Sequence, residues 1–200
     1  MHQLGVLHTL QGDLAEAQSQ LEAALAQAED FYGPDQARTA DVKISLAVLR
    51  TKQGRREEAE SLFDESLKNM QARLDDDHPQ LLRARSYLGV LYREQSRRDE
   101  AEKLLSEVIE SQSEKLGPDH PHTLTSTHEL ALVYVAREDY DEAEPLLLDA
   151  YKGRETKLSP EHPHTIESLR ELVKLYESWG KPEEAAKWRA RQPGAGNGGT

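Results

Sequence analysis

Residues 117–158 read GPDHPHTLTSTHELALVYVAREDYDEAEPLLLDAYKGRETKL, one complete copy of a unit that recurs along the chain. The copy before it spans residues 75–116, and the copy after it begins at Ser159. An internal period of this length is typical of repeat architectures, in which neighbouring units bury one another's apolar faces. The fold therefore follows from the content of one unit.

A Glu-Ala pair marks the register of the repeat. Its alanines recur every 42 residues, at Ala17, Ala59, Ala101, Ala143 and Ala185. A leucine precedes each alanine by 13 residues, at Leu4, Leu46, Leu88, Leu130 and Leu172. A small residue follows that leucine in four copies, and Val173 follows it in the last. We predict five repeats, at about 1–32, 33–74, 75–116, 117–158 and 159–191.

Each unit predicts two helices. In residues 120–137 apolar and small side chains fall at helical spacing, and they do so again in residues 140–158. Ala131 and Ala143 are small enough to let the paired helices approach closely. The sequence therefore predicts an all-α chain of antiparallel helix pairs.

The joints between repeats have a consistent chemistry. Gly33 and Gly117 occupy the position where a helix end favours a positive φ, and we expect Asp75 and Ser159 to occupy it in the other copies. His-Pro follows at residues 78–79, 120–121 and 162–163. Proline suits the first position of a helix, because its missing N–H has no partner there.

The two ends differ from the middle. Met1 aligns with Lys43, so the first helix lacks about two turns, and we expect the chain to be a fragment of something longer or to start inside a repeat. Trp179 and Trp188 are predicted to cover the apolar face of the last repeat. Residues 192–200 have no apolar pattern and are predicted to be a disordered tail.

Composition limits the function. The net charge of -12 disfavours nucleic-acid binding. No apolar run approaches the length of a membrane span, and the N-terminus does not resemble a signal peptide. The chain has no cysteine, which excludes disulfides. We expect a cytoplasmic, monomeric protein that contacts neither nucleic acid nor membrane.

The helix pair, with Leu-Gly or Leu-Ala in its first helix and Glu-Ala in its second, resembles the tetratricopeptide repeat. The 42-residue period, the joint LGPDHPHTL and the second helix YDEAEPLLLDA resemble the kinesin-light-chain type. The resemblance covers residues 1–191. It implies a right-handed superhelical solenoid whose first helices line a concave groove for peptides. The last repeat is similar to that of bacterial multidomain proteins in which such an array follows a kinase or another signalling domain.

The kinesin-light-chain type often holds the peptide backbone with asparagines placed just before the Leu-Gly or Leu-Ala pair. No asparagine occupies those positions here, so this backbone contact is not expected. The predicted peptide-binding groove instead consists of Ile44, Val48, Lys52, Arg83, Tyr87, Val90, Arg93, His128, Leu132 and Val135. Its aliphatic, aromatic and cationic side chains favour an extended peptide with acidic and apolar residues. The alternative is that these arginines are ordinary solvated residues.

The histidines at the joints suggest one further chemistry. His120, His122, His162 and His164 have a spacing that can ligate a metal, but the same pattern arises if His120 and His162 cap helices while His122 and His164 lie in solvent, and we predict no metal site. There is no phosphate-binding glycine loop and no catalytic triad spacing, so we predict neither an enzyme nor a cofactor. The leading hypothesis is a protein–protein interaction scaffold. The alternatives are a regulatory or sensor part of a larger signalling protein and a self-associating spacer.

Overall fold

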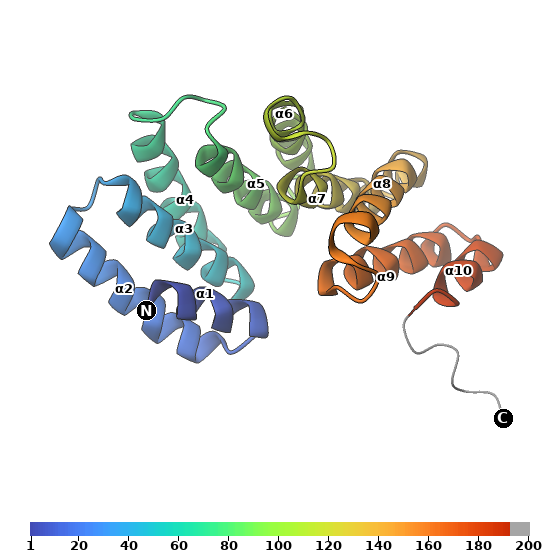
Figure 1. The fold of residues 1–200 in the computed structure, drawn as a ribbon, viewed down its shortest axis with the longest axis horizontal. Helices are drawn as coiled ribbons and strands as arrows, with labels where there is room; N and C mark the ends of the chain where they lie inside the picture. The colour runs from blue at the N-terminus through green and yellow to red at the C-terminus, as the bar shows by residue number, and fades with distance from the viewer. Residues whose placement is uncertain (193–200) are drawn as a thin grey trace. The chain divides into compact units, whose positions relative to one another are not determined.

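The computed structural model describes residues 1–192, and the predicted tail beyond Gln192 lies outside the described residues. Within them the chain forms ten α-helices and no strand (Figure 1). Their bounds are α1 His2–Gln11, α2 Leu14–Tyr32, α3 Ala37–Lys52, α4 Arg56–Gln71, α5 Pro79–Glu94, α6 Arg98–Leu116, α7 Pro121–Arg137, α8 Tyr140–Leu158, α9 Pro163–Ser178 and α10 Pro182–Arg189. The prediction of an all-α chain with two helices per repeat is confirmed.

The chain divides into two compact units. The first spans Met1–Arg97 and holds α1 to α5, and the second begins at Arg98 and holds α6 to α10. Within the first unit α2 packs against α1 and α3, and α4 packs against α3 and α5. Within the second, α7 lies between α6 and α8, and α9 lies between α8 and α10. Each unit therefore has a core of its own.

Histidine caps three of the first helices. The Nδ1 atoms of His78, His120 and His162 accept hydrogen bonds from the backbone N–H groups of Gln80, His122 and His164, at 3.3, 3.2 and 3.2 Å. A proline follows each histidine at the first helical position. Capping satisfies an N–H group that the helix itself leaves without a partner. The capping interpretation of these histidines is confirmed.

The ends of the second helices agree with the prediction in three of the four joints. Gly33, Gly117 and Ser159 follow α2, α6 and α8 with φ of 94°, 94° and 115°. The expectation for Asp75 is wrong, because Asp75 is not among the positive-φ residues of the described chain. Instead, α4 ends early, at Gln71, and Arg73 and Leu74 both donate their N–H groups to the carbonyl of Met70. A shorter helix avoids the left-handed backbone that an aspartate adopts at a cost.

Each unit buries the predicted small and aliphatic residues. In the first unit Ala17 and Leu21 of α2 pack against Leu46 and Leu49 of α3. In the second, Ala143, Leu147 and Tyr151 of α8 pack with α7, α9 and α10. These contacts remove large apolar area from water, which is the main favourable term of folding.

The C-terminal tryptophans pack as predicted. Trp179 and Trp188 both lie against the core of the second unit. The ring of Trp188 meets Tyr151 edge to face, with centroids 5.2 Å apart, and Trp179 stacks on Tyr176 at 6.3 Å. The pair covers apolar surface that no further repeat covers in the described chain.

The glutamate that follows the alanine of the Glu-Ala pair forms hydrogen bonds to the next repeat. Glu102 of α6 accepts hydrogen bonds from Tyr134 at 2.9 Å and from Arg137 at 2.5 Å, both on α7. Glu144 of α8 accepts one from Tyr176 of α9 at 2.5 Å. Burial and the hydrogen-bonded carboxylate of Glu102 raise the pKa of Tyr134 to about 12. Tyr134 and Tyr176 therefore contribute to the contacts between neighbouring repeats.

The surroundings of Gly153 on α8 show how closely this helix packs against α7. A Cβ at this helical position would lie 2.5 and 2.7 Å from the two methyl groups of the buried Leu124. An alanine in place of a helical glycine normally stabilises a protein by about 1 kcal/mol. We expect Gly153→Ala to lower the free energy of unfolding instead, by about 1–2 kcal/mol, because the core is overpacked. Urea denaturation followed by circular dichroism checks this, with the exposed Lys152→Ala as the control. A more stable Gly153→Ala variant would contradict the packing.

Glu102 predicts a pH dependence of stability. Burial alone would raise its pKa, but the hydrogen bonds from Arg137 and Tyr134 lower it below the ordinary 4.5. A lowered folded-state pKa means that the ionised carboxylate stabilises the fold above pH 4.5, and that this contribution disappears as the pH falls through the folded-state pKa. Glu102→Gln should therefore cost about 1 kcal/mol at pH 7 and less near pH 3. Denaturation at both pH values measures the difference, with the exposed Glu107→Gln as control. An equal cost at both pH values would refute this assignment.

Candidate functional site

The structure distributes the predicted groove residues over both units. On α3 and α5 of the first unit lie Ile44, Val48, Lys52, Arg83, Tyr87, Val90 and Arg93. On α7 of the second unit lie His128, Leu132 and Val135. His128 is only 1% exposed, and its Nδ1 lies 3.3 Å from the hydroxyl of Ser168 on α9. Its side chain therefore contributes to packing between helices and is not accessible to a ligand in this structure.

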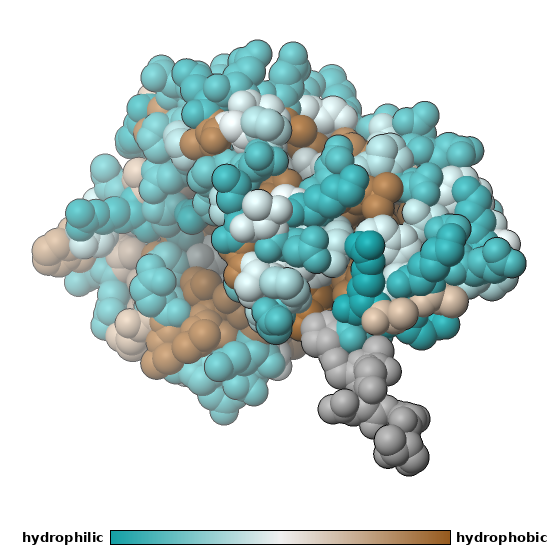
Figure 2. Space-filling view, turned by 45° about the vertical axis from the view of Figure 1, so that its right-hand side comes forward, coloured by the Kyte–Doolittle hydropathy of each residue, from teal (hydrophilic) through white to brown (hydrophobic). Residues whose placement is uncertain are grey.

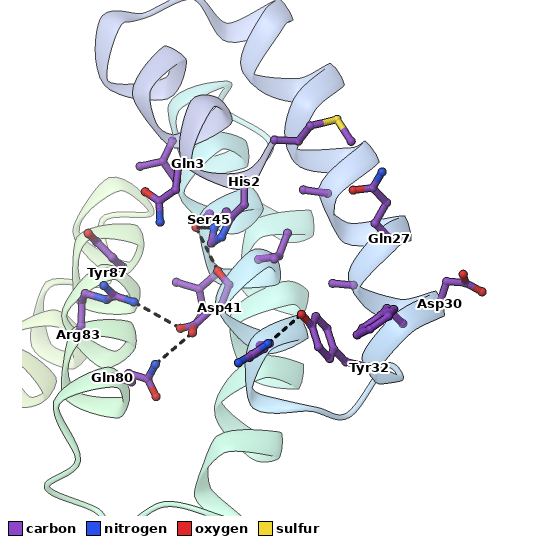
Figure 3. Close-up of a pocket in the computed structure, with 18 residues that line it drawn as sticks. His2, Gln3, Gln27, Asp30, Tyr32, Asp41, Ser45, Gln80, Arg83 and Tyr87 are labelled. Atoms are coloured by element: carbon purple, nitrogen blue, oxygen red, sulfur yellow. Dashed lines mark hydrogen bonds and ion pairs between the residues drawn. The ribbon is translucent and has the colours of Figure 1, made fainter.

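A pocket of about 960 Å³ lies in the first unit, between the start of α1, the end of α2, α3 and α5 (Figure 3). Three predicted groove residues line it, namely Ile44, Arg83 and Tyr87. The remaining first-unit groove residues do not line it. The prediction missed its other polar wall residues, including His2, Asp41 and Gln80.

The pocket has a simple origin in the repeat register. The helices α3, α5, α7 and α9 all begin at the same point of the 42-residue period, at 37, 79, 121 and 163. The helix α1 begins seven residues later in that register, at His2, the counterpart of Ile44. The space that the first two turns fill in the other repeats is therefore open above Ala24, Ala28 and Val42, which form a small apolar cluster.

The small side chain at position 28 enlarges this opening. The counterparts of Ala28 in the next three repeats are Met70, Gln112 and Arg154, all buried. Gln112 contacts Ser126 at 2.8 Å, and Arg154 donates to Ser168 at 2.8 Å, each on the following first helix. The side chain of Ala28 is too short to contact the following first helix in this way, so the base of the pocket stays open and apolar.

One wall of the pocket is polar. Asp41 of α3 accepts hydrogen bonds from Gln80 at 3.1 Å and Arg83 at 3.4 Å, both on α5. His2 contacts the hydroxyl of Ser45 through Nε2 at 2.8 Å, one turn further along α3. Figure 3 shows these side chains converging from three helices on the same side of the pocket.

Burial controls the electrostatics of this wall. It raises the pKa of Asp41 above 3.8, against the opposing positive charge of Arg83. It lowers the pKa of His2 below 6.5, against the opposing negative charge of Asp41. Both groups therefore favour their neutral forms more than they would in water.

The opposite rim is aromatic. The phenol of Tyr32 accepts a hydrogen bond from Arg38 at 2.9 Å, and the Arg38 guanidinium also lies 5.0 Å from the centre of that ring. Phe31 beside it is 80% exposed. An apolar base, a cationic and polar wall and an aromatic rim together can hold a peptide segment.

Among residues 1–192, no three histidine, aspartate or glutamate side chains gather in a way that could hold a metal ion. No helix in the described part of the chain is long and apolar enough to cross a membrane.

The coupling of Asp41, His2 and Arg83 is directly measurable. The positive charge of Arg83 lowers the pKa of both Asp41 and His2. We therefore expect Arg83→Gln to raise both pKa values, as read from NMR titration of the two side chains. Arg85→Gln is the matched control, because Arg85 is on the same helix but pairs with Asp76. Unchanged pKa values in Arg83→Gln, or equal changes in both variants, would contradict the electrostatic coupling of Arg83 to Asp41 and His2.

Comparison with known proteins agrees with the fold. A putative kinesin light chain with nearly identical TPR-like repeats from Podosopora anserina is 27% identical, with a TM-score of 0.71 over 95% of this chain and 90% of that one. BtubC (BKLC) from P. vanneervenii is 23% identical, with a TM-score of 0.71 over 91% and 71% of the two chains. MamA AMB-1 is 21% identical, with a TM-score of 0.58 over 95% and 96%. The last two likenesses concern the fold alone.

A comparison with curated proteins finds no match. The family model described as tetratricopeptide repeat matches residues 1–72, 38–114 and 80–156, which together cover most of the chain. These matches agree with the 42-residue period, the paired helices and the buried alanine and leucine positions. The chain belongs to the tetratricopeptide repeat family.

Proposed function

We propose that this chain is a protein–protein interaction scaffold, and that the pocket of its first unit holds a peptide segment of a partner protein. The observation that carries the proposal is the pairing of an apolar base with cationic side chains on a pocket of about 960 Å³. Membership of a family of non-enzymatic repeat scaffolds supports the same class of function. We also propose that the protein is monomeric and that it is located in the cytoplasm.

The pocket is lined by Arg38 and Arg83 and also by Asp30 and Asp41, and its two arginines favour acidic side chains on the peptide. Arg83 reaches Asp41 only at 3.4 Å and keeps 41% of its side chain exposed, so much of its guanidinium faces the pocket and solvent. Arg38 lies on the opposite rim. Guanidinium groups bind carboxylates through two parallel hydrogen bonds, which makes them well suited to aspartate and glutamate side chains. Phe31, Tyr32 and Tyr87 offer apolar contact to neighbouring residues of the same peptide.

The broader groove predicted from sequence extends this site along α3 and α5. Val48 and Val90 are partly buried and Lys52 is exposed. Arg93 forms an ion pair with Glu94 at 3.1 Å and lies outside the pocket. In the proposal these residues make secondary contacts, and Arg83 makes the central one.

A peptide selection tests the proposal. Random peptides displayed on phage and selected on the wild-type protein should be enriched in acidic and apolar residues. Arg83→Glu should weaken the selected peptides by about tenfold or more, because like charges repel and a carboxylate partner is lost, which corresponds to about 1.4 kcal/mol. Calorimetric titration measures the affinities.

Two controls separate the pocket from general electrostatics. Arg85→Glu makes the same change of net charge on α5 at a residue outside the pocket, and it should leave the affinity nearly unchanged. Arg93→Glu should have an intermediate effect if the peptide continues along the groove. Selected peptides that bind Arg83→Glu as tightly as wild type would refute the pocket.

A further inference from the structure

The joint between α8 and α9, drawn in orange in Figure 1, differs from the two glycine joints of the chain in the residue that forms it. Ser159 ends α8 with φ 115° and ψ 160°, a conformation that is almost restricted to glycine and that strains a residue with a Cβ. At the same position of its repeat Gly33 has φ 94° and ψ 158°, and Gly117 has φ 94°. The serine therefore adopts a backbone that suits a glycine.

A hydrogen bond that both glycine joints contain is absent from this joint in the described residues. Thr39 donates its hydroxyl to the carbonyl of Gly33 at 2.7 Å. Thr123 donates in the same way to the carbonyl of Gly117 at 2.9 Å. Their counterpart Thr165 is 1% exposed, and its hydroxyl has no hydrogen-bond partner among the described residues. A buried hydroxyl without a partner is unfavourable, because it gives up its bonds to water on folding. The start of α9 thus lacks a bond that holds the starts of α3 and α7.

A buried charge lies at the same place. Arg154 of α8 is 2% exposed, although hydrophilic residues form most of the coloured surface in Figure 2. Arg154 donates to the backbone carbonyl of His164 at 3.0 Å and to the hydroxyl of Ser168 at 2.8 Å. The carboxylate of Glu167 lies 3.6 Å from its guanidinium. Burial lowers the pKa of Arg154 all the same, against the opposing negative charges of Glu167 and Glu129. These contacts therefore do not fully replace the hydration of the charge.

The preceding joint, between α6 and α7, has a neutral pair at the same two positions. Gln112 of α6 accepts a hydrogen bond from Ser126 of α7 at 2.8 Å. One repeat later these positions hold Arg154 and Ser168. The joint between α6 and α7 thus combines a glycine, a bonded threonine and an uncharged pair. It provides an internal reference for the joint between α8 and α9.

The remainder of α9 is well packed. Leu169, Leu172 and Leu175 belong to the core cluster that also contains Leu147 of α8. Near the end of the helix Tyr176 donates a hydrogen bond to Glu144 of α8, and stacked Trp179 follows it. The strain, the orphaned hydroxyl and the buried charge are therefore confined to one end of the α8–α9 contact. An opening at that end leaves the core cluster in place.

We propose that the first turns of α9, residues 162–168, open locally from α8 and act as a conformational gate of the second unit. Ser168 lies against His128, which we predicted from the sequence to be a groove residue and which is 1% exposed in the closed form. Opening removes this cover and separates Arg154 from its partners on α9. It therefore presents an imidazole and a guanidinium to the solvent. The gate is separate from the pocket of the first unit and from the function proposed for that pocket.

Native-state hydrogen exchange of the full chain, followed by NMR, tests the gate. The amides of residues 166–170 on α9 are compared with those of residues 124–128 on α7, which have the same positions in the repeat. We expect the protection factors of residues 166–170 to be lower by about tenfold or more. Their exchange should change little in low concentrations of urea, because a local opening exposes little surface. The amides of residues 172–176 should be better protected and more sensitive to urea.

Variants identify the cause of the opening. Ser159→Gly and Arg154→Gln each introduce the residue of the α6–α7 joint, and each should raise the protection of residues 166–170 by about threefold to tenfold. Gly117→Ser is the reciprocal change and should lower the protection of residues 124–128. Glu138→Gly is the matched control, because it relieves a positive φ of 66° at the other end of α7 and should leave residues 166–170 unchanged.

Three results would overturn the gate. The first is equal protection of residues 166–170 and 124–128. The second is unchanged protection of residues 166–170 in both Ser159→Gly and Arg154→Gln. The third is a urea dependence of residues 166–170 equal to that of residues 172–176, which would mean that the whole unit opens at once.

Discussion

Burial of two aliphatic side chains of α3, α5, α7 and α9 beneath the second helix of the preceding repeat is the contact on which this structure depends. It is built four times in the two units, with an alanine that allows close approach and a large side chain four residues later. Because each repeat contacts mainly its neighbours, stability is roughly a sum of such interfaces. A repeat without this cover exposes the same apolar residues to water, as α1 does.

The proposed pocket lies where this regularity is interrupted in the described chain. It occupies the place that the first two turns fill in α3, α5, α7 and α9. The pocket combines Asp41, Arg83 and His2 with an apolar base of Ala24, Ala28 and Val42. An extended peptide with acidic and apolar side chains suits this combination.

Sequence reasoning predicted the helices and their contacts well, and the binding site only in part. The Glu-Ala and leucine registers identified Ala143 and Leu130 as buried, because a helical period of apolar residues directly reports a buried face. Of the predicted groove residues, Ile44, Arg83 and Tyr87 line the pocket, whereas His2, Asp41 and Gln80 line it without having been predicted. Sequence reasoning also assigned His128 to a groove, although Ser168 of the next repeat, 40 residues later, packs against it. Periodicity assigns a residue to a face of its helix but does not say how deeply a neighbouring helix covers that face.

The amino-acid sequence alone determined the fold class, the period, the capping histidines and the family resemblance, since all of these are local and repeat every 42 residues. The tertiary structure alone decided which side chains share a pocket. Asp41, Gln80 and Arg83 meet because α3 and α5 pack in one unit, and burial then sets the pKa of Asp41. Such burial depends on the atoms of several helices at once, and no single repeat encodes it.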